Sequence, residues 1–190
     1  MKITATRIPD VKILEPRIFG DERGFFLESW RDSWIPELGI QGRFVQDNHS
    51  KSRRNSLRGL HYQVQHPQGK LVRVIQGRVF DVAVDLRVSS DHFGQWVGIE
   101  LSGENQRQLW VPPGFAHGFL VLSETAEFLY KCTEYYSPEH ERSLAWDDPE
   151  LAIQWPLAAG ESPLLSARDQ RGIGFRDAEY YGERCSELSL

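Results

Sequence analysis

The chain has 190 residues, with 22 Lys and Arg against 27 Asp and Glu and a formal net charge of −5. Its length suits one domain, and 40% hydrophobic and 12% aromatic residues argue against disorder. The sequence shows no apolar run of membrane-spanning length and no apolar core of a signal peptide. Its acidic total disfavours nucleic acid as a partner. Cys132 and Cys185 are too few for a disulfide framework and lack metal-ligand spacing, so we expect a reduced, cytoplasmic setting.

Short strands dominate the predicted elements, after one short helix over residues 32–39. Residues 70–86 alternate with period two around a turn at Gln76-Gly77, with Phe80, Val82, Val84 and Leu86 on one face. We expect further strands at 95–101, 109–111, 118–122 and 127–133, and one helical turn at 148–153. This spacing predicts an all-β sandwich or barrel, as one domain with an N-terminal arm and a C-terminal wrap.

Dinucleotide, P-loop and nucleophile-elbow motifs are absent from the sequence, which disfavours Rossmann dehydrogenases, P-loop enzymes and α/β-hydrolases. Two segments suit an anionic ligand instead. Residues 21–28 form either a hairpin turn with solvated charges or an anion or ring clamp, in which Arg23 would fit phosphate oxygens. Residues 46–63 hold one lysine, three arginines and two histidines, as a basic surface loop or as a phosphate or carboxylate site.

His61 lies in a strand-like stretch and is either a core histidine or a functional one. Strict alternation places Arg58 and His61 on opposite faces of a strand. If both reach one site, Gly59 must mark a bulge or bend.

The segment 110–119 contains P-x-G-x-x-H at Pro112, Gly114 and His117, which resembles the second half-motif of cupin barrels. In metal cupins this histidine joins an earlier H-x-H and a glutamate. Here the earlier segment reads His61-Tyr-Gln63, so one ligand is missing and we expect no metal.

Tyr130 shares a strand face with Phe128 and Cys132, as a core tyrosine or as a proton donor. Asp169, in the stretch Ser166–Asp169, is by itself an ordinary loop carboxylate. Paired with His61, it would fix the imidazole tautomer and raise its basicity.

Together these segments resemble the dTDP-4-dehydrorhamnose 3,5-epimerase family over about residues 1–170, and the last 15–20 residues match nothing. The matching stretches are Leu14–Glu28, Phe44–Ser52 (FVQDNHSKS), Leu57–Gln63 (LRGLHYQ), Gln68–Val74, Val79–Arg87, Phe93–Gly98, Asn105–Phe119 and Glu127–Arg142. The resemblance implies a single domain over 1–190, with a cupin-type jelly-roll core at about 40–135. It also implies a homodimer with exchanged N-terminal arms, a dTDP-sugar substrate, and no metal or cofactor.

The resemblance further implies epimerisation of a 4-keto sugar at C3 and C5. By motif position, His61 is the base with Asp169 as its partner, Tyr130 is the acid, and Lys70 stabilises the enolate oxygen O4. The positions implied to contact nucleotide, diphosphate or sugar are Phe19, Arg23, Glu28, Gln46, Asn48, Arg58, His117, Tyr136, Glu141 and Arg168. Alternatives are a mono-epimerase or ketoisomerase on a related sugar, a non-catalytic sugar-nucleotide-binding cupin, and a metal-dependent cupin oxygenase.

Overall fold

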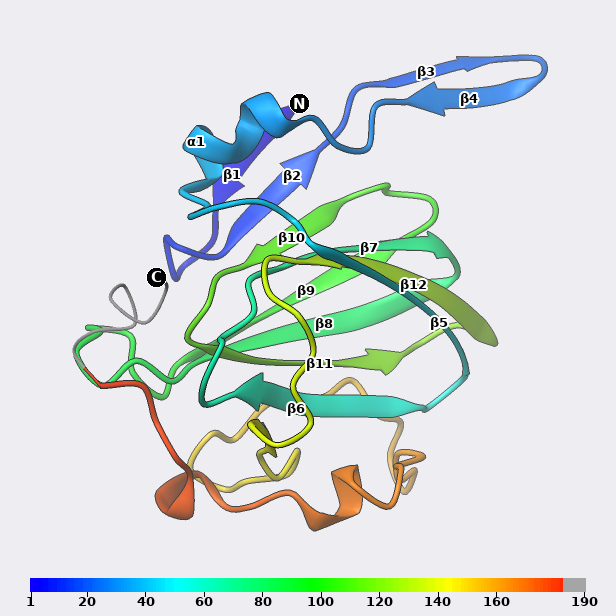
Figure 1. The fold of residues 1–190 in the computed structure, drawn as a ribbon. Helices are drawn as coiled ribbons and strands as arrows, with labels where there is room; N and C mark the ends of the chain where they lie inside the picture. Colours follow the sequence, from blue (N-terminus) through cyan, green and yellow to red (C-terminus); the bar gives the residue numbers. More distant parts are fainter. Residues whose placement is uncertain (183–190) are drawn as a thin grey trace.

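Two antiparallel sheets face each other and form the walls of a flattened barrel (Figure 1). The computed structural model describes residues 1–182. The six-stranded sheet has the order β1-β2-β10-β7-β12-β5, and the five-stranded sheet has the order β13-β6-β11-β8-β9. The strands are β1 (Lys2–Ala5), β2 (Lys12–Glu15), β3 (Ile18–Asp21), β4 (Gly24–Leu27), β5 (Gln46–Arg53), β6 (Leu57–Gln63), β7 (Lys70–Gln76), β8 (Arg78–Asp85), β9 (Trp96–Ser102), β10 (Gln108–Val111), β11 (Phe115–Val121), β12 (Thr125–Cys132) and β13 (Glu141–Ser143). The all-β prediction is confirmed.

The predicted turn between residues 76 and 78 lies at Gly77, whose φ of +79° joins β7 to β8. The predicted short helix is a 3₁₀ turn, η1 (Asp32–Trp34), continued by α1 (Ile35–Leu38). Gly39, in the left-handed conformation, ends it. The helical turn expected at 148–153 is a single hydrogen-bonded turn rather than a helix, closed by the Ala152 amide donating to the Asp148 carbonyl at 2.9 Å.

Both faces of β8 are buried, but only one of them lines the interior of the barrel. The apolar face predicted from the sequence, which includes Val82 and Val84, points away from the barrel. It packs under the chain after β13, which crosses the outer face of the five-stranded sheet (Figure 1). That segment includes two further 3₁₀ turns, η2 (Asp169–Arg171) and η3 (Phe175–Asp177). The opposite face of β8 lines the barrel, where Val79 and Ala83 join Phe128 of β12 in the core.

The N-terminal part of the chain divides into two structural roles. Strands β1 and β2 extend the six-stranded sheet beside β10. Strands β3 and β4 form a separate hairpin that projects from the body (Figure 1). The hairpin exposes four large apolar side chains: Ile18, Phe19, Phe25 and Phe26. Within residues 1–182, no helix combines the length and apolar character needed to cross a membrane.

Candidate active site

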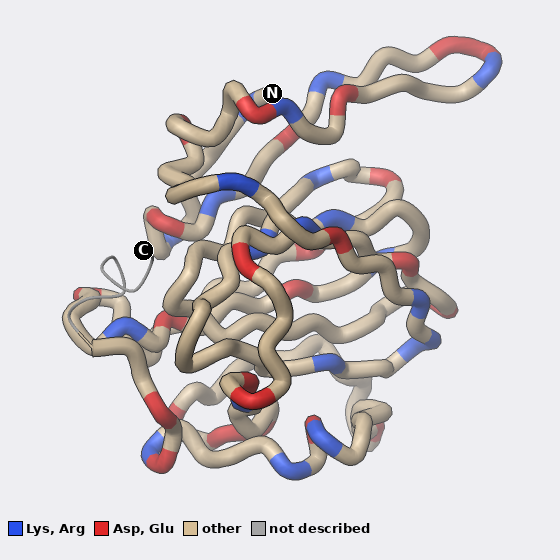
Figure 2. The backbone as a smooth tube through the Cα atoms, viewed as in Figure 1, with Lys and Arg blue, Asp and Glu red and all other residues tan. Residues whose placement is uncertain are grey.

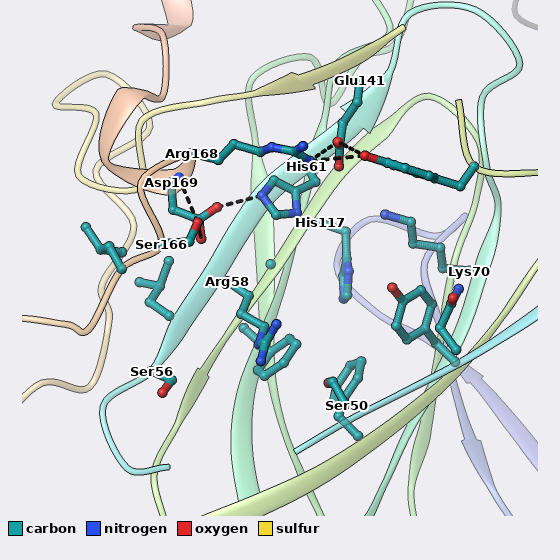
Figure 3. Close-up of a pocket in the computed structure, with 18 of the residues that line it drawn as sticks. Ser50, Ser56, Arg58, His61, Lys70, His117, Glu141, Ser166, Arg168 and Asp169 are labelled. Carbon is teal, nitrogen blue, oxygen red and sulfur yellow. Dashed lines mark hydrogen bonds and ion pairs between the residues drawn. The ribbon is translucent and has the colours of Figure 1, made fainter. Parts of the chain in front are cut away.

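A cavity of about 680 Å³ lies between the two sheets, bordered by the loop at 164–169 (Figure 3). Strands of both sheets and this loop supply its lining, so residues distant in sequence meet there. The residues suggested by the sequence that line it are Gln46, Asn48, Arg58, His61, Lys70, His117, Tyr130, Tyr136, Glu141, Arg168 and Asp169.

A bulge in β6 brings Arg58 and His61 to this one cavity. The pairing with β11 advances three residues on β6 while it advances two on β11, from His117 opposite His61 to Phe119 opposite Arg58. Gly59 has a φ of +116°, and a Cβ there would lie 2.6 Å from the Gly118 Cα. The bulge or bend predicted at Gly59, on condition that Arg58 and His61 share one site, is therefore present as a bulge.

His61 and Asp169 form a hydrogen-bonded pair, with 2.6 Å between Nε2 and Oδ1. The carboxylate is 3% exposed and also accepts the Gly59 amide at 3.3 Å and the Ser166 hydroxyl at 2.6 Å. Burial raises the pKa of Asp169, but the bonds from His61 and Ser166 outweigh it and hold the pKa below its usual value. The carboxylate therefore stays ionised at neutral pH and orients the imidazole that faces the cavity.

Lys70 and Tyr130 reach the cavity from neighbouring strands. Within residues 1–182, neither the Lys70 ammonium nor the Tyr130 hydroxyl makes a hydrogen bond, which leaves both for a ligand. Burial lowers the pKa of Lys70, partly offset by Cys132, Glu141 and Asp81. Burial raises the pKa of Tyr130 to about 12, so the phenol keeps its proton at neutral pH.

A second histidine–carboxylate pair stands beside the first. His117 Nε2 lies 2.9 and 3.1 Å from the two oxygens of Asp81, which is fully buried on the inner face of β8. Burial raises the pKa of Asp81, partly offset by His117 and Lys70. The sequence alone suggested no role for Asp81. The available signal was an acidic residue on a β-strand whose other face is apolar.

The cavity mouth carries a polar cluster. The Tyr136 hydroxyl donates to Glu141 at 2.7 Å, and Arg168 donates to both residues. The Tyr136 amide donates to Gln46 at 2.9 Å, and Gln46 donates to Asn48 at 3.1 Å. These contacts tie β5, β13 and the 164–169 loop together around the opening.

Arg58 adds positive charge from the strand wall. Its Nε donates to the Ser52 hydroxyl at 2.9 Å, which fixes the side chain against β5. The guanidinium otherwise lines the cavity together with His61 (Figure 3). Arg58 and Arg168 are thus two cationic groups on one cavity, an arrangement suited to an anionic ligand.

Three residues suggested by the sequence lie outside this chain's cavity. Phe19 of β3 is 51% exposed and stacks under Arg17. Arg23 pairs with Asp21 at the hairpin tip, where charges of both signs meet (Figure 2). Glu28 pairs with Arg31 after the hairpin.

The positions that resemble cupin metal ligands have other uses here. His61 and His117 are each bonded to a carboxylate. The Gln63 amide donates to the His66 carbonyl at 2.7 Å and accepts the Ser137 amide at 2.9 Å. Among residues 1–182, no group of three or more His, Cys, Asp or Glu is placed to hold a metal ion.

Comparisons with known proteins agree over nearly the whole chain. A family model described as dTDP-4-dehydrorhamnose 3,5-epimerase matches residues 5–177. The dTDP-4-dehydrorhamnose 3,5-epimerase of Pseudomonas aeruginosa is 59% identical over 182 residues, which is 95% of this chain and 99% of that protein. A Legionella pneumophila structure, a dTDP-6-deoxy-D-glucose-3,5-epimerase in complex with dTDP-4-keto-L-rhamnose, superposes with a TM-score of 0.90. It is 56% identical and the match covers 94% of each chain.

A mono-epimerase has a similar fold. A 3'-monoepimerase from Streptomyces bikiniensis in complex with dTDP-quinovose has a TM-score of 0.82, at 33% identity over 90% of this chain and 86% of that one. The structural matches confirm the cupin-type jelly roll. The matched length and identity show that the chain belongs to the dTDP-4-dehydrorhamnose 3,5-epimerase family.

Proposed function

We propose that this chain epimerises dTDP-4-dehydro-6-deoxy-D-glucose at C3 and C5, giving dTDP-4-dehydro-L-rhamnose for dTDP-L-rhamnose biosynthesis. The observation that carries this proposal is one cavity that holds the His61–Asp169 pair together with Lys70 and Tyr130. Family membership supports the same reaction. We expect the reaction to take place in the cytoplasm.

The chemistry follows from the C4 ketone, which acidifies the protons at both C3 and C5. His61, oriented by Asp169, removes a proton, and the resulting enolate carries its charge on O4. The buried Lys70 ammonium stabilises that oxygen in a cavity of low dielectric constant. Tyr130 returns a proton to the opposite face of the ring, which inverts the stereochemistry. Each positioned acid or base contributes about 10²–10⁴-fold.

The nucleotide part of the substrate supplies binding energy away from the reacting carbons. Arg58 and Arg168 anchor the diphosphate, and Tyr136 stacks on the thymine at the cavity mouth. The remaining proposed contacts are Gln46, Asn48 and Glu141 with the nucleotide and His117 beside the sugar.

A second copy of the chain completes the site in this proposal. The β3–β4 hairpin leaves the body and exposes Phe19 and Phe26, an unusual loss of apolar burial for a monomer (Figure 1). Inserted into a partner's cavity, Phe19 would flank the thymine, while Arg23 and Glu28 would reach the nucleotide and its diphosphate. A homodimer with exchanged arms therefore accounts for the three residues that lie outside this chain's cavity.

Proton NMR in D₂O tests the reaction, using the 4-keto sugar nucleotide and protein treated with EDTA. Deuterium entering both C3 and C5 supports the double epimerase and a base that needs no metal. Entry at one carbon would indicate a mono-epimerase, and a shifted carbonyl would indicate a ketoisomerase. Normal dTDP binding without exchange would leave a binding cupin, and exchange restored only by metal would overturn the mechanism. His61→Asn that turned over at the wild-type rate would overturn the assignment of the base.

Co-expression of His61→Asn with Arg23→Ala tests the exchanged hairpin. At a substrate concentration well below the wild-type KM, each variant alone is expected to be nearly inactive, because one lacks the base and the other binds the nucleotide weakly. About half of randomly assembled dimers are mixed, and one of their two sites has an intact base and an intact incoming arm. Activity of about a quarter of wild type is therefore expected. If the hairpin served its own chain, neither site of a mixed dimer would be complete, and co-expression would restore nothing.

A further inference from the structure

Ser166 holds the carboxylate that orients the proposed base. Its hydroxyl donates to Asp169 Oδ2 at 2.6 Å, while His61 and the Gly59 amide take Oδ1. The same hydroxyl accepts the Asp169 amide at 3.2 Å, so backbone and side chain of Asp169 both meet Ser166. Ser166 is not among the site residues inferred from the sequence.

The two oxygens of Asp169 therefore have different partners. A carboxylate held through one oxygen alone can rotate about its last bond and change the atom that it presents. The Ser166 bond on Oδ2 opposes that rotation, and Oδ1 stays directed at the His61 Nε2 atom (Figure 3). The imidazole then keeps the tautomer that leaves Nδ1 to accept a proton.

Hydrogen bonds of residues 164–170 hold Ser166 and Asp169 in this arrangement. Ser-x-x-Asp at 166–169 places a serine oxygen against the amide three residues later, the pairing found at the start of a helical turn. The turn is closed by the Gln170 amide donating to the Ser166 carbonyl at 3.0 Å. Just before it, the Leu164 amide donates to the Asn55 carbonyl at 2.7 Å and fixes the segment beside β6.

We propose that Ser166, which borders the cavity, is a positioning residue for the epimerisation, acting on His61 through Asp169, to which its hydroxyl is bonded. This inference rests on the proposed function. Ser166 is an exposed residue, so removal of its hydroxyl leaves no cavity in the core. Its loss should therefore change the chemistry more than the fold.

Ser90 provides a matched control. Its hydroxyl also donates to a buried carboxylate, that of Asp85, at 2.6 Å, and it lies outside the cavity. Ser166→Ala should lower kcat about tenfold, with KM within about twofold. The substitution removes one hydrogen bond to the charged Asp169 carboxylate and affects only the His61–Asp169 pair. In a plot of kcat against pH, the fall in kcat at acid pH should move to higher pH in this variant. The reason is that the Asp169 carboxylate loses the Ser166 hydroxyl, a donor that stabilises its negative charge. Ser90→Ala should change neither.

Two further variants separate positioning from simple structural support. Ser166→Thr keeps the hydroxyl, and the exposed position leaves room for the added methyl group. This variant should therefore have the kcat and the pH profile of wild type. In an Asp169→Asn background, Ser166→Ala should add little further loss, because both changes act on one pair. Wild-type kinetics in Ser166→Ala, a change in KM alone, or full additivity with Asp169→Asn would each overturn the proposal. An inactive wild-type protein would instead refute the proposed function.

Discussion

The proposed role of Tyr130 as a proton donor can be tested by a substitution that leaves the packing of its ring unchanged. Its ring packs beside Phe128 in the core, while its hydroxyl makes no hydrogen bond within the described chain. Replacing it with phenylalanine keeps the packing and removes only the proposed proton donor. We expect Tyr130→Phe to lower kcat about 10²–10⁴-fold, with the dTDP dissociation constant within about threefold. NMR-followed turnover and titration calorimetry measure the two quantities.

Tyr62 supplies the control for that experiment. Burial also raises its pKa to about 12, but it packs against Tyr181 on the other face of β6, outside the cavity. Tyr62→Phe should leave kcat unchanged. A loss of dTDP affinity above tenfold in Tyr130→Phe would reassign Tyr130 to recognition of the nucleotide.

At the scale of one strand, the bulge in β6 determines whether the site exists. Gly59 has a left-handed φ of +116°, and an added Cβ would meet the Gly118 Cα and the His117 carbonyl at 2.6 Å. Because strand β11 cannot yield there without disturbing His117, Gly59→Ala should lower the free energy of unfolding by about 2–4 kcal/mol. It should also lower kcat by displacing His61. Urea denaturation and turnover measure these effects.

Gly42 separates backbone strain from crowding in that test. It has a φ of +89°, but a Cβ added there would meet nothing within 4 Å. Gly42→Ala should cost only about 1 kcal/mol, with normal kcat. Equal losses in the two variants would mean that the close approach of β6 and β11 has no special part in the site.

Local patterns predicted most of the strands but not which face of β8 lines the site. Alternation correctly separated Val82 and Val84 from Asp81, because period two depends on neighbours alone. It could not tell that the apolar face lies under the C-terminal segment, since that packing joins residues far apart in sequence. For the same reason the sequence pointed to His61 and Gly59 but left out Ser166, whose role depends on a contact between loop and strand.

Asp148 links two parts of the segment after β13 to each other. Its carboxylate accepts the amides of Glu150, Leu151 and Phe175 at 2.8–3.1 Å. Burial raises the pKa of Asp148, but these bonds outweigh it and leave the pKa below its usual value. A carboxyl with a depressed folded pKa stabilises the protein above its unfolded pKa, and that stability is lost as the pH falls through the folded pKa.

Asp148→Asn should therefore lower the free energy of unfolding by about 1–3 kcal/mol at pH 7. The difference from wild type should shrink as the pH falls below about 4, where the wild-type carboxyl takes up its proton. Denaturant titrations at several pH values measure this. Asp147→Asn, at the exposed neighbouring position, should behave as wild type. A deficit in Asp148→Asn that persisted unchanged into acid would show that the charge of Asp148 is not what holds the segment.

For the whole molecule, the barrel and the projecting hairpin have different tasks. The core clusters lie between the sheets, beneath the C-terminal segment and beneath the short helix α1, and no hairpin residue belongs to the core clusters of residues 1–182. Ile18 and Leu27 are paired neighbours at the base of the hairpin, so a short glycine linker can replace residues 18–27 without stretching the chain. The excised protein should fold, because no core contact is removed.

Excision should nevertheless abolish turnover and the dimer together, since the proposed arm exchange supplies both. Sedimentation should give a monomer with the far-ultraviolet circular dichroism of a β protein, and dTDP should bind more weakly through loss of Phe19 and Arg23. Arg23→Ala, which keeps the hairpin, should stay dimeric and lose mainly dTDP affinity. If the excised protein remained a dimer with normal turnover, the hairpin would have no part in the site. If it failed to fold, the barrel would depend on the arm for its stability, contrary to the packing seen in this structure.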